Sequence, residues 1–196
     1  SELRRGLDRG ELEPWFQPQI EAATGRLVGF EALVRWRHPE SGILSPHFFL
    51  DIAEDARLGR QITDAMLAKA LPALAAWREA GLDVPRIGFN LGLRELRDPA
   101  LHDRLVFDLD RYGLAPADLA LEILESALIE GDDDPAHGAV ARLSRSGFAI
   151  DLDDFGTGHA SLANLQRLAV DRIKIDRAFV RDLPGKADLR KVTSAM

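Results

Sequence analysis

The sequence contains no cysteine and no long apolar run. Without cysteine there can be no disulfide framework and no cysteine-ligated zinc or iron–sulfur site. The longest apolar stretch, Ala70–Trp77, is too short to span a membrane and contains a proline. The amino-terminal residues lack the apolar segment of a signal peptide. We therefore expect a chain without a membrane segment that resides in the cytoplasm.

Positive charge is also scarce. The chain has 25 lysine and arginine residues against 32 acidic residues, which gives a formal net charge of −7. Such a surface has no general attraction for a nucleic-acid polymer or an anionic membrane. With 46% hydrophobic residues in 196, the chain can build one sizeable core. We expect residues 1–196 to form one domain, and the absence of an initiator methionine indicates that it comes from a longer protein.

Short apolar segments alternate with longer segments of helical pattern along the chain. This alternation predicts an α/β fold with a mainly parallel sheet. The predicted strands are Trp15–Glu21, Leu27–Trp36, Arg86–Leu91, Leu119–Glu125, Phe148–Asp153 and Asp171–Ile175. The predicted helices are Ser45–Leu58, Arg60–Ala80, Leu93–Tyr112, Asp134–Ser146, Ser161–Leu168 and one that begins near Lys186.

Five of these strands have one apolar face and one face with a polar group, because alternate residues of a strand point to opposite sides. In the strand Phe148–Asp153, for example, Ile150 and Leu152 oppose Asp151 and Asp153. The apolar faces require a cover of helices. A polar inner face repeated on several strands fits the interior of a barrel better than an open sheet packed on both faces. Active sites of such barrels lie at the carboxyl ends of the strands.

The polar residues near these strand ends form a candidate metal site. Their carboxylate and amide oxygens suit Mg²⁺ or Mn²⁺. Ca²⁺ could compete for the same oxygen ligands and act as an inhibitor. Two adjacent acids favour a two-metal site, since many converging carboxylates could not all stay ionised without cations. A lysine there could orient a water or hold a substrate oxygen, and an arginine suits a phosphate. The set is Glu31, Asn90, Glu122, Asp153, Asp154 and Lys174, with Arg35 nearby.

Two acids other than Asp153 lie in or directly after the predicted strand Phe148–Asp153. Asp154 belongs by alternation to the outer face, so it joins the site only if the strand ends there and Gly156 and Gly158 let the chain turn. Asp151 points inward and is expected to pair with Arg172 or Lys174.

Each residue taken alone also has a structural explanation. A single acid or asparagine at a strand end is usually a cap or turn residue, and a single lysine is usually an ion-pair partner. Their joint placement on matching faces is what favours a site. Three tryptophans (Trp15, Trp36, Trp77) are expected to serve packing rather than stacking, with the question left open for Trp36 because it lies near the site.

Six segments of the chain, in order, resemble motifs of the EAL domain family of cyclic di-GMP phosphodiesterases. They are "WFQPQI", "FEALVRWRHPESG", "FNLGLREL", "LEILES", "DDFGTGHASL" and "DRIKIDRAFV". The resemblance covers the chain from about Trp15 to its end. It implies a TIM-type (β/α) barrel whose first strand runs antiparallel to the others.

The resemblance also implies hydrolysis of cyclic di-GMP to linear pGpG with two Mg²⁺ or Mn²⁺ ions. By matched position, Glu31, Asn90, Glu122 and Asp153 would hold metal, and Asp154 would bind the second ion. Lys174 would contact the water or the phosphate, and Gln17, Leu33 and Arg35 would contact the substrate. Glu125 would stabilise the loop after the two aspartates. Family members are commonly joined to sensory or GGDEF domains and often form homodimers.

The carboxyl end departs from the family pattern, because the later "AEGVE"-like and "QGY"-like motifs are absent. We count six strands where a barrel needs eight. We therefore expect the carboxyl-terminal strands to be missing from this chain, and the 196-residue chain alone to have little phosphodiesterase activity. Two alternatives stay open: a non-catalytic cyclic di-GMP-binding sensor module, and a different metal-dependent barrel enzyme of the enolase type.

Overall fold

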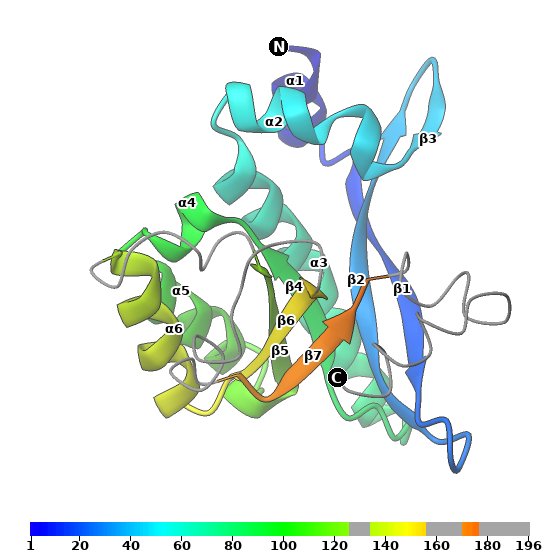
Figure 1. The fold of residues 1–196 in the computed structure, drawn as a ribbon. Helices are drawn as coiled ribbons and strands as arrows, with labels where there is room; N and C mark the ends of the chain where they lie inside the picture. Colours follow the sequence, from blue (N-terminus) through cyan, green and yellow to red (C-terminus); the bar gives the residue numbers. More distant parts are fainter. Residues whose placement is uncertain (126–133, 156–169, 177–196) are drawn as a thin grey trace, which may run out of the picture.

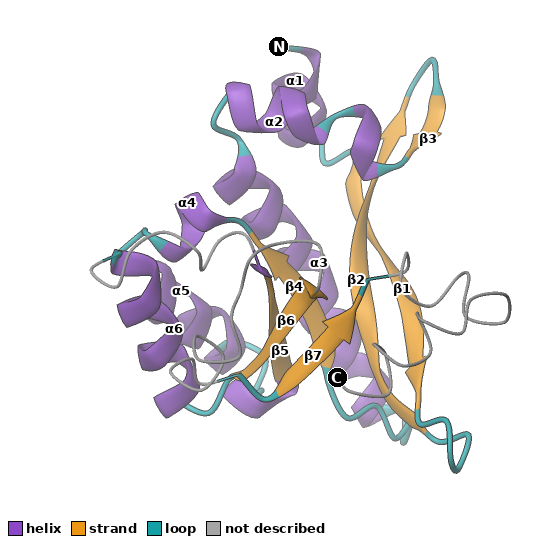
Figure 2. Ribbon diagram, viewed as in Figure 1, coloured by secondary structure: helices purple, strands orange, loops and turns teal. Residues whose placement is uncertain are grey.

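The structure is a computed structural model, and it describes residues 1–125, 134–155 and 170–176. In this part of the chain a curved sheet carries helices on one side (Figures 1 and 2). The strands are β1 (Leu12–Ile20), β2 (Leu27–His38), β3 (Gly42–Leu44), β4 (Ile87–Leu91), β5 (Leu119–Leu124), β6 (Ala149–Phe155) and β7 (Arg172–Ile175). The α-helices are α1 (Glu2–Asp8), α2 (Leu50–Asp55), α3 (Gly59–Glu79), α4 (Leu93–Leu96), α5 (Leu101–Asp110) and α6 (Pro135–Arg145), and the 3₁₀ turns are Pro46–Phe48 and Pro116–Asp118.

The sheet has the strand order β1-β2-β4-β5-β6-β7, and β3 pairs with β2. Strand β1 runs antiparallel to β2, whereas β2, β4, β5, β6 and β7 are parallel neighbours. This is the architecture of a TIM-type (β/α) barrel, and the antiparallel first strand confirms the prediction. The described strands do not close the barrel, because β1 and β7 lie at the two ends of the strand order.

The outer face of the sheet is apolar and packs against the helices. The predicted alternation is confirmed there, because the outer residues of β4, β5 and β6 are at most 3% exposed. Each aliphatic side chain buried in this way contributes about 1.5–3 kcal/mol of transfer free energy. These residues are Ile87, Phe89, Leu91, Leu119, Leu121, Ile123, Ile150 and Leu152.

Two long helices of the sequence prediction are each divided in the structure. The segment Leu93–Tyr112 forms α4 and α5, since Pro99 lacks a backbone donor and disfavours helical geometry in the residue before it. The segment Ser45–Leu58 forms a 3₁₀ turn and α2, and Arg57 beyond α2 has a positive φ of 56°. Helices α3 and α6 match their predictions closely. The predicted helices at Ser161–Leu168 and near Lys186 lie outside the described residues.

Helix α1, which Ser1 caps, and the three-residue strand β3 were not predicted. Strand β1 was predicted from Trp15, but it begins earlier, at Leu12, although Pro14 lies within it. Prolines are compatible with β1 because it lies at an end of the strand order, where one row of backbone donors needs no strand partner. None of the helices in the described ranges is long and apolar enough to cross a membrane.

Candidate metal centre

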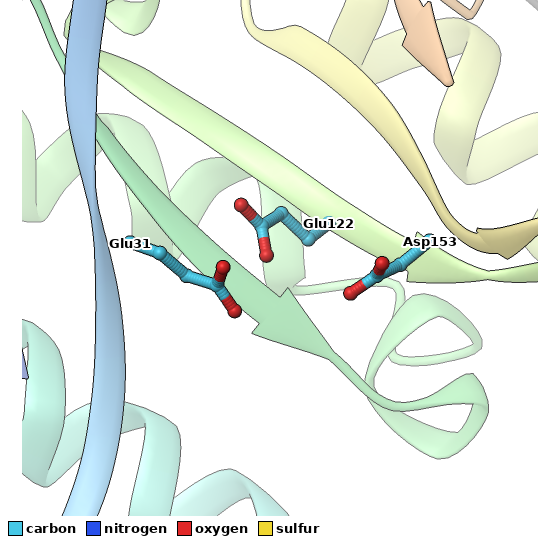
Figure 3. A group of neighbouring side chains, drawn as sticks. All are labelled: Glu31, Glu122 and Asp153. Carbon is cyan, nitrogen blue, oxygen red and sulfur yellow. The ribbon is translucent and has the colours of Figure 1, made fainter. Parts of the chain in front are cut away.

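Three carboxylates converge on the inner face of the sheet from three different strands. Glu31 comes from β2, Glu122 from β5 and Asp153 from β6, and Figure 3 shows their carboxyl groups pointing toward one another. One oxygen atom of each carboxylate lies within 4.8 Å of the corresponding oxygens of the other two. The sequence predicted all three, because alternation places each of them on the inner face of its strand.

Lys174 of β7 lies among the three carboxylates. Its Nζ donates to Glu122 Oε2 at 2.8 Å, to Asp153 Oδ2 at 2.9 Å and to Glu31 Oε2 at 3.1 Å. Asn90 of β4 donates from Nδ2 to Glu31 Oε1 at 3.3 Å. We call Glu31, Glu122, Asp153 and Lys174 the lysine cluster. It contains three carboxylates and one ammonium group, so its charges do not balance.

The pKa values of the lysine cluster reflect this imbalance. Burial raises the pKa of Glu122 to about 7, and the charges of Glu31 and Asp153 add to the effect although Lys174 opposes it. Burial alone would lower the pKa of Lys174, but its hydrogen bonds and attraction to the carboxylates outweigh burial and raise that pKa. The lysine cluster therefore holds one cation strongly and has negative charge in excess.

The donor chemistry of this cluster fits a divalent cation. Carboxylate oxygens, with an amide oxygen available from Asn90, are the hard ligands that Mg²⁺ and Mn²⁺ prefer. The Lys174 ammonium contacts all three carboxylates, which shows that a single positive group can reach every one of them.

Gly88 and Gln19 support Glu122, and the sequence analysis did not select either of them. A Cβ atom at Gly88 would lie 2.4 Å from Glu122 Oε1, so any larger residue would displace the carboxylate. Gln19 Nε2 lies 3.5 Å from the same oxygen. A glycine on the inner face of a predicted strand was the available signal, because such a glycine often marks a close approach by another group.

Asp154 reaches the edge of the site through a bulge in β6. Leu152 pairs with Ile173 and Phe155 with Ile175, so three steps along β6 match two steps along β7. Asp154 itself has a positive φ of 53°. The expectation that the strand ends at Asp154 is wrong, because β6 continues to Phe155 and the bulge lies within the strand. Gly156 and Gly158 lie outside the described residues.

The carboxyl group of Asp154 is close to other acids. Burial raises its pKa, and the neighbouring charges of Asp153 and Asp176 raise it further. Its backbone amide donates to Asp153 Oδ1 at 2.9 Å. Asp176 was placed on the inner face by the sequence pattern but was not selected as a site residue.

Asp151 and Arg172 form a separate ion pair on the same face. Arg172 donates from Nε to Asp151 Oδ1 at 2.9 Å and from Nη2 to Oδ2 at 2.5 Å. The Asp151 side chain is 1% exposed. The prediction that Asp151 pairs with Arg172 or Lys174 is thus resolved in favour of Arg172. We call these two residues the arginine pair.

The predicted substrate-contact residues lie on the same face of β1 and β2. Gln17 pairs in register with Glu31, and Leu33 and Arg35 follow Glu31 at alternate positions of β2. Glu125 is buried at the end of β5, while the loop that it was expected to stabilise lies outside the described residues. Trp36 is buried in the core and donates to Glu11 Oε2 at 2.9 Å, which decides the question left open for this residue in favour of packing.

Comparisons with known proteins agree on one family. The EAL domain model matches residues 1–196. The chain is 36% identical over 195 residues to the bifunctional diguanylate cyclase/cyclic di-GMP phosphodiesterase MucR of Pseudomonas aeruginosa, covering 100% of this chain and 28% of that protein. It is also 36% identical over 195 residues to the cyclic di-GMP phosphodiesterase NbdA of the same species, covering 100% of this chain and 25% of that one.

Similarity extends to a solved structure. The structure of the MucR phosphodiesterase in complex with c-di-GMP superposes with a TM-score of 0.92 and 36% identity, covering 99% of this chain and 78% of that one. The chain thus spans about a quarter of the length of these curated relatives, and most of the solved domain.

Proposed function

The chain belongs to the EAL domain family, and from this premise we propose that it is the catalytic domain of a metal-dependent phosphodiesterase that hydrolyses cyclic di-GMP to linear pGpG. The observation that carries the proposal is the lysine cluster, in which three carboxylates lie within 4.8 Å of one another with only one ammonium group among them. Relatives named as cyclic di-GMP phosphodiesterases support the substrate.

In this proposal Glu31, Asn90, Glu122 and Asp153 hold one Mg²⁺ or Mn²⁺ ion, and Asp153 and Asp154 hold the second. When bound, such ions lower the pKa of a water and stabilise the charge that develops on the phosphoryl and leaving oxygens. The bulge at Asp154 serves this arrangement by directing two consecutive acids toward one site. Gly88 keeps the space in which the Glu122 carboxylate must lie.

The residues of the chain also position the reactants. Gln17, Leu33 and Arg35 contact the dianionic ligand, and the Lys174 ammonium holds the attacking water or a phosphoryl oxygen. The water oxygen forms the new bond to phosphorus in line with the bond to the 3′ oxygen, which breaks, and the 3′ oxygen takes up the proton that the water gives up. Glu125 is assigned to support of the loop that follows Asp153 and Asp154.

We further propose that this domain acts in the cytoplasm, joined to sensory or GGDEF domains and paired with a second copy. Support for additional domains comes from the lengths of the relatives, since the chain covers only 28% and 25% of two of them.

The test supplies the full-length protein with cyclic di-GMP and Mg²⁺ or Mn²⁺ and follows pGpG by chromatography. We expect product with the metal and none with a chelator, and we expect Asp153→Asn to abolish product. Asp110→Asn on the outer helix α5 is the matched control and should retain activity. Binding of cyclic di-GMP without any product would indicate the non-catalytic sensor instead, and absence of binding would contradict both functions.

A further inference from the structure

Trp15 does not pack in the core, contrary to the expectation from sequence. Its side chain is 46% exposed. It pairs in register with Leu33, which places it on the inner face together with Gln17 and Arg35. A large exposed aromatic ring next to the candidate substrate residues needs an explanation.

The Trp15 ring is held by a short chain of polar contacts. Its Nε1 donates to Glu13 Oε1 at 3.0 Å, and Glu13 also accepts from Arg37 Nη2 at 2.8 Å and from Arg37 Nε at 3.3 Å. The hydrogen bond from Trp15, followed by that from Arg37, lowers the pKa of Glu13 in spite of an opposing effect of burial. The Trp15 ring thus has a hydrogen-bond partner on its own strand in the absence of ligand.

The guanidinium of Arg35 lies over this ring. Its Cζ is 5.7 Å from the ring centroid, and its Nη1 donates to the carbonyl oxygen of Val34 at 2.8 Å. In the described ranges Arg35 forms no ion pair with a carboxylate, whereas Arg37 on the same strand pairs with Glu13. An aromatic face orients a guanidinium without neutralising it, which a carboxylate partner would do.

Arg35 is also at a useful distance from the lysine cluster. It follows Glu31 by four residues on the same face of β2, which corresponds to about 13 Å along the strand. A ligand with two phosphates and two bases can span such a distance, so a group held near Glu31 leaves another part of the ligand near Arg35.

We propose that Trp15 is a positioning residue that holds the Arg35 guanidinium, unpaired and ready for a phosphate of the ligand. The proposal rests on the proposed function for the identity of that ligand. Trp15 acts through Arg35, whose guanidinium Cζ lies 5.7 Å from the centroid of the Trp15 ring.

A double-mutant cycle in the full-length protein tests this inference, with Kd and KM for cyclic di-GMP as readouts. Trp15→Leu should raise both about two- to fivefold and leave kcat within about twofold, since exposed cation–π contacts have energies of this size. Trp15→Phe, which keeps an aromatic face, should recover most of the loss. Arg35→Ala should have a larger effect, and Trp15→Leu in the Arg35→Ala background should add less than about twofold. Additive losses would overturn the proposal, because they would mean that Trp15 contacts the ligand independently.

A measurement without ligand separates this inference from the proposed function. The side-chain Nε–H resonance of Arg35 should show a ring-current shift that Trp15→Leu removes. Phe107→Leu, an equally drastic change at an exposed aromatic residue of α5, should leave the resonance and the affinity unchanged. No shift difference in Trp15→Leu would overturn the positioning role. If the wild-type protein does not bind cyclic di-GMP, the proposed function fails, and the resonance still decides whether Trp15 orients Arg35.

Discussion

The lysine cluster and the arginine pair lie on the same face of the sheet and share strands β6 and β7, yet their charges are arranged differently. In the arginine pair one carboxylate meets one guanidinium through two hydrogen bonds, and the Asp151 side chain is 1% exposed. In the lysine cluster three carboxylates share one ammonium. A balanced pair has no further need for a cation, whereas the lysine cluster does. The difference separates a structural ion pair from a candidate metal centre by charge balance alone.

The largest expected effect distinguishes the two aspartates of β6. Asp153→Asn should lower the phosphodiesterase rate on the order of 1000-fold, because metal ions contribute several kcal/mol of transition-state stabilisation. Its stability in chelator should stay near wild type, since it removes one of three repelling charges. Asp151→Asn should instead lower the free energy of unfolding by about 1–3 kcal/mol, because Arg172 loses a buried partner. Urea unfolding and steady-state kinetics on both variants test this. If the two variants lost the same activity and the same stability, Asp153 would not differ from Asp151 in role.

A second comparison replaces the positively charged side chain of each group, Lys174 in the lysine cluster and Arg172 in the arginine pair. In the presence of chelator, Lys174→Met should destabilise the protein by about 3 kcal/mol, because the buried Glu122 and the half-buried Glu31 and Asp153 lose their counter-ion. Added Mg²⁺ should restore most of that stability, since a divalent ion can replace the ammonium. Arg172→Met should also be destabilising, but Mg²⁺ should not rescue it, because Asp151 offers a single carboxylate. Melting temperatures with and without Mg²⁺ test this; rescue of both variants would contradict the account.

The raised pKa of Glu122 predicts a pH dependence in the presence of chelator. This carboxyl group has a pKa of about 7 in the folded state and about 4.5 in the unfolded state. Its contribution to the free energy of unfolding is therefore fully present below pH 4.5. That contribution is lost as the pH rises from 4.5 through 7, by an amount on the order of 3 kcal/mol. The difference between wild type and Glu122→Gln, measured by urea unfolding from pH 4.5 to 8, should show it. A difference that is independent of pH would refute this prediction.

The smallest expected effect concerns the space above Gly88. Gly88→Ala should weaken Mg²⁺ binding about tenfold, because its methyl group would meet Glu122 Oε1 at 2.4 Å. Gly138→Ala in α6 is the matched control: nothing lies within 4 Å of its Cβ position, and it should stabilise the fold by about 0.4–1 kcal/mol. Calorimetric titration of Mg²⁺ would show whether the two alanines differ. Unchanged affinity in Gly88→Ala would mean that Glu122 does not need its present position.

Strand alternation was sufficient to predict the inner face and all four residues of the lysine cluster. Glu31, Glu122, Asp153 and Lys174 are separated by long stretches of sequence, but each occupies an inward position of its strand. The same rule placed Asp154 on the outer face, because alternation cannot anticipate a bulge in which an acidic residue adopts a positive φ. Trp15 was misjudged because aromatic residues usually pack, and its exposure depends on the pairing of β1 with β2.

Other features depend on contacts that a single sequence does not reveal. The choice of Arg172 over Lys174 as the partner of Asp151 follows from the register of β6 and β7. The approach of Glu122 to Gly88 follows from the pairing of β4 with β5. The predicted helix boundaries were wrong where one residue, such as Pro99, interrupts an otherwise continuous helical pattern.

The most direct test of the central claim is to locate the cations by anomalous diffraction from crystals of the protein grown with Mn²⁺. We predict a Mn²⁺ peak among the carboxylates of Glu31, Glu122 and Asp153, with the Lys174 ammonium displaced from its present contacts, and no peak at Asp151. A Mn²⁺ ion bound at Asp151, or no ion among the three carboxylates, would contradict the claim that unbalanced charge in the lysine cluster creates the metal centre.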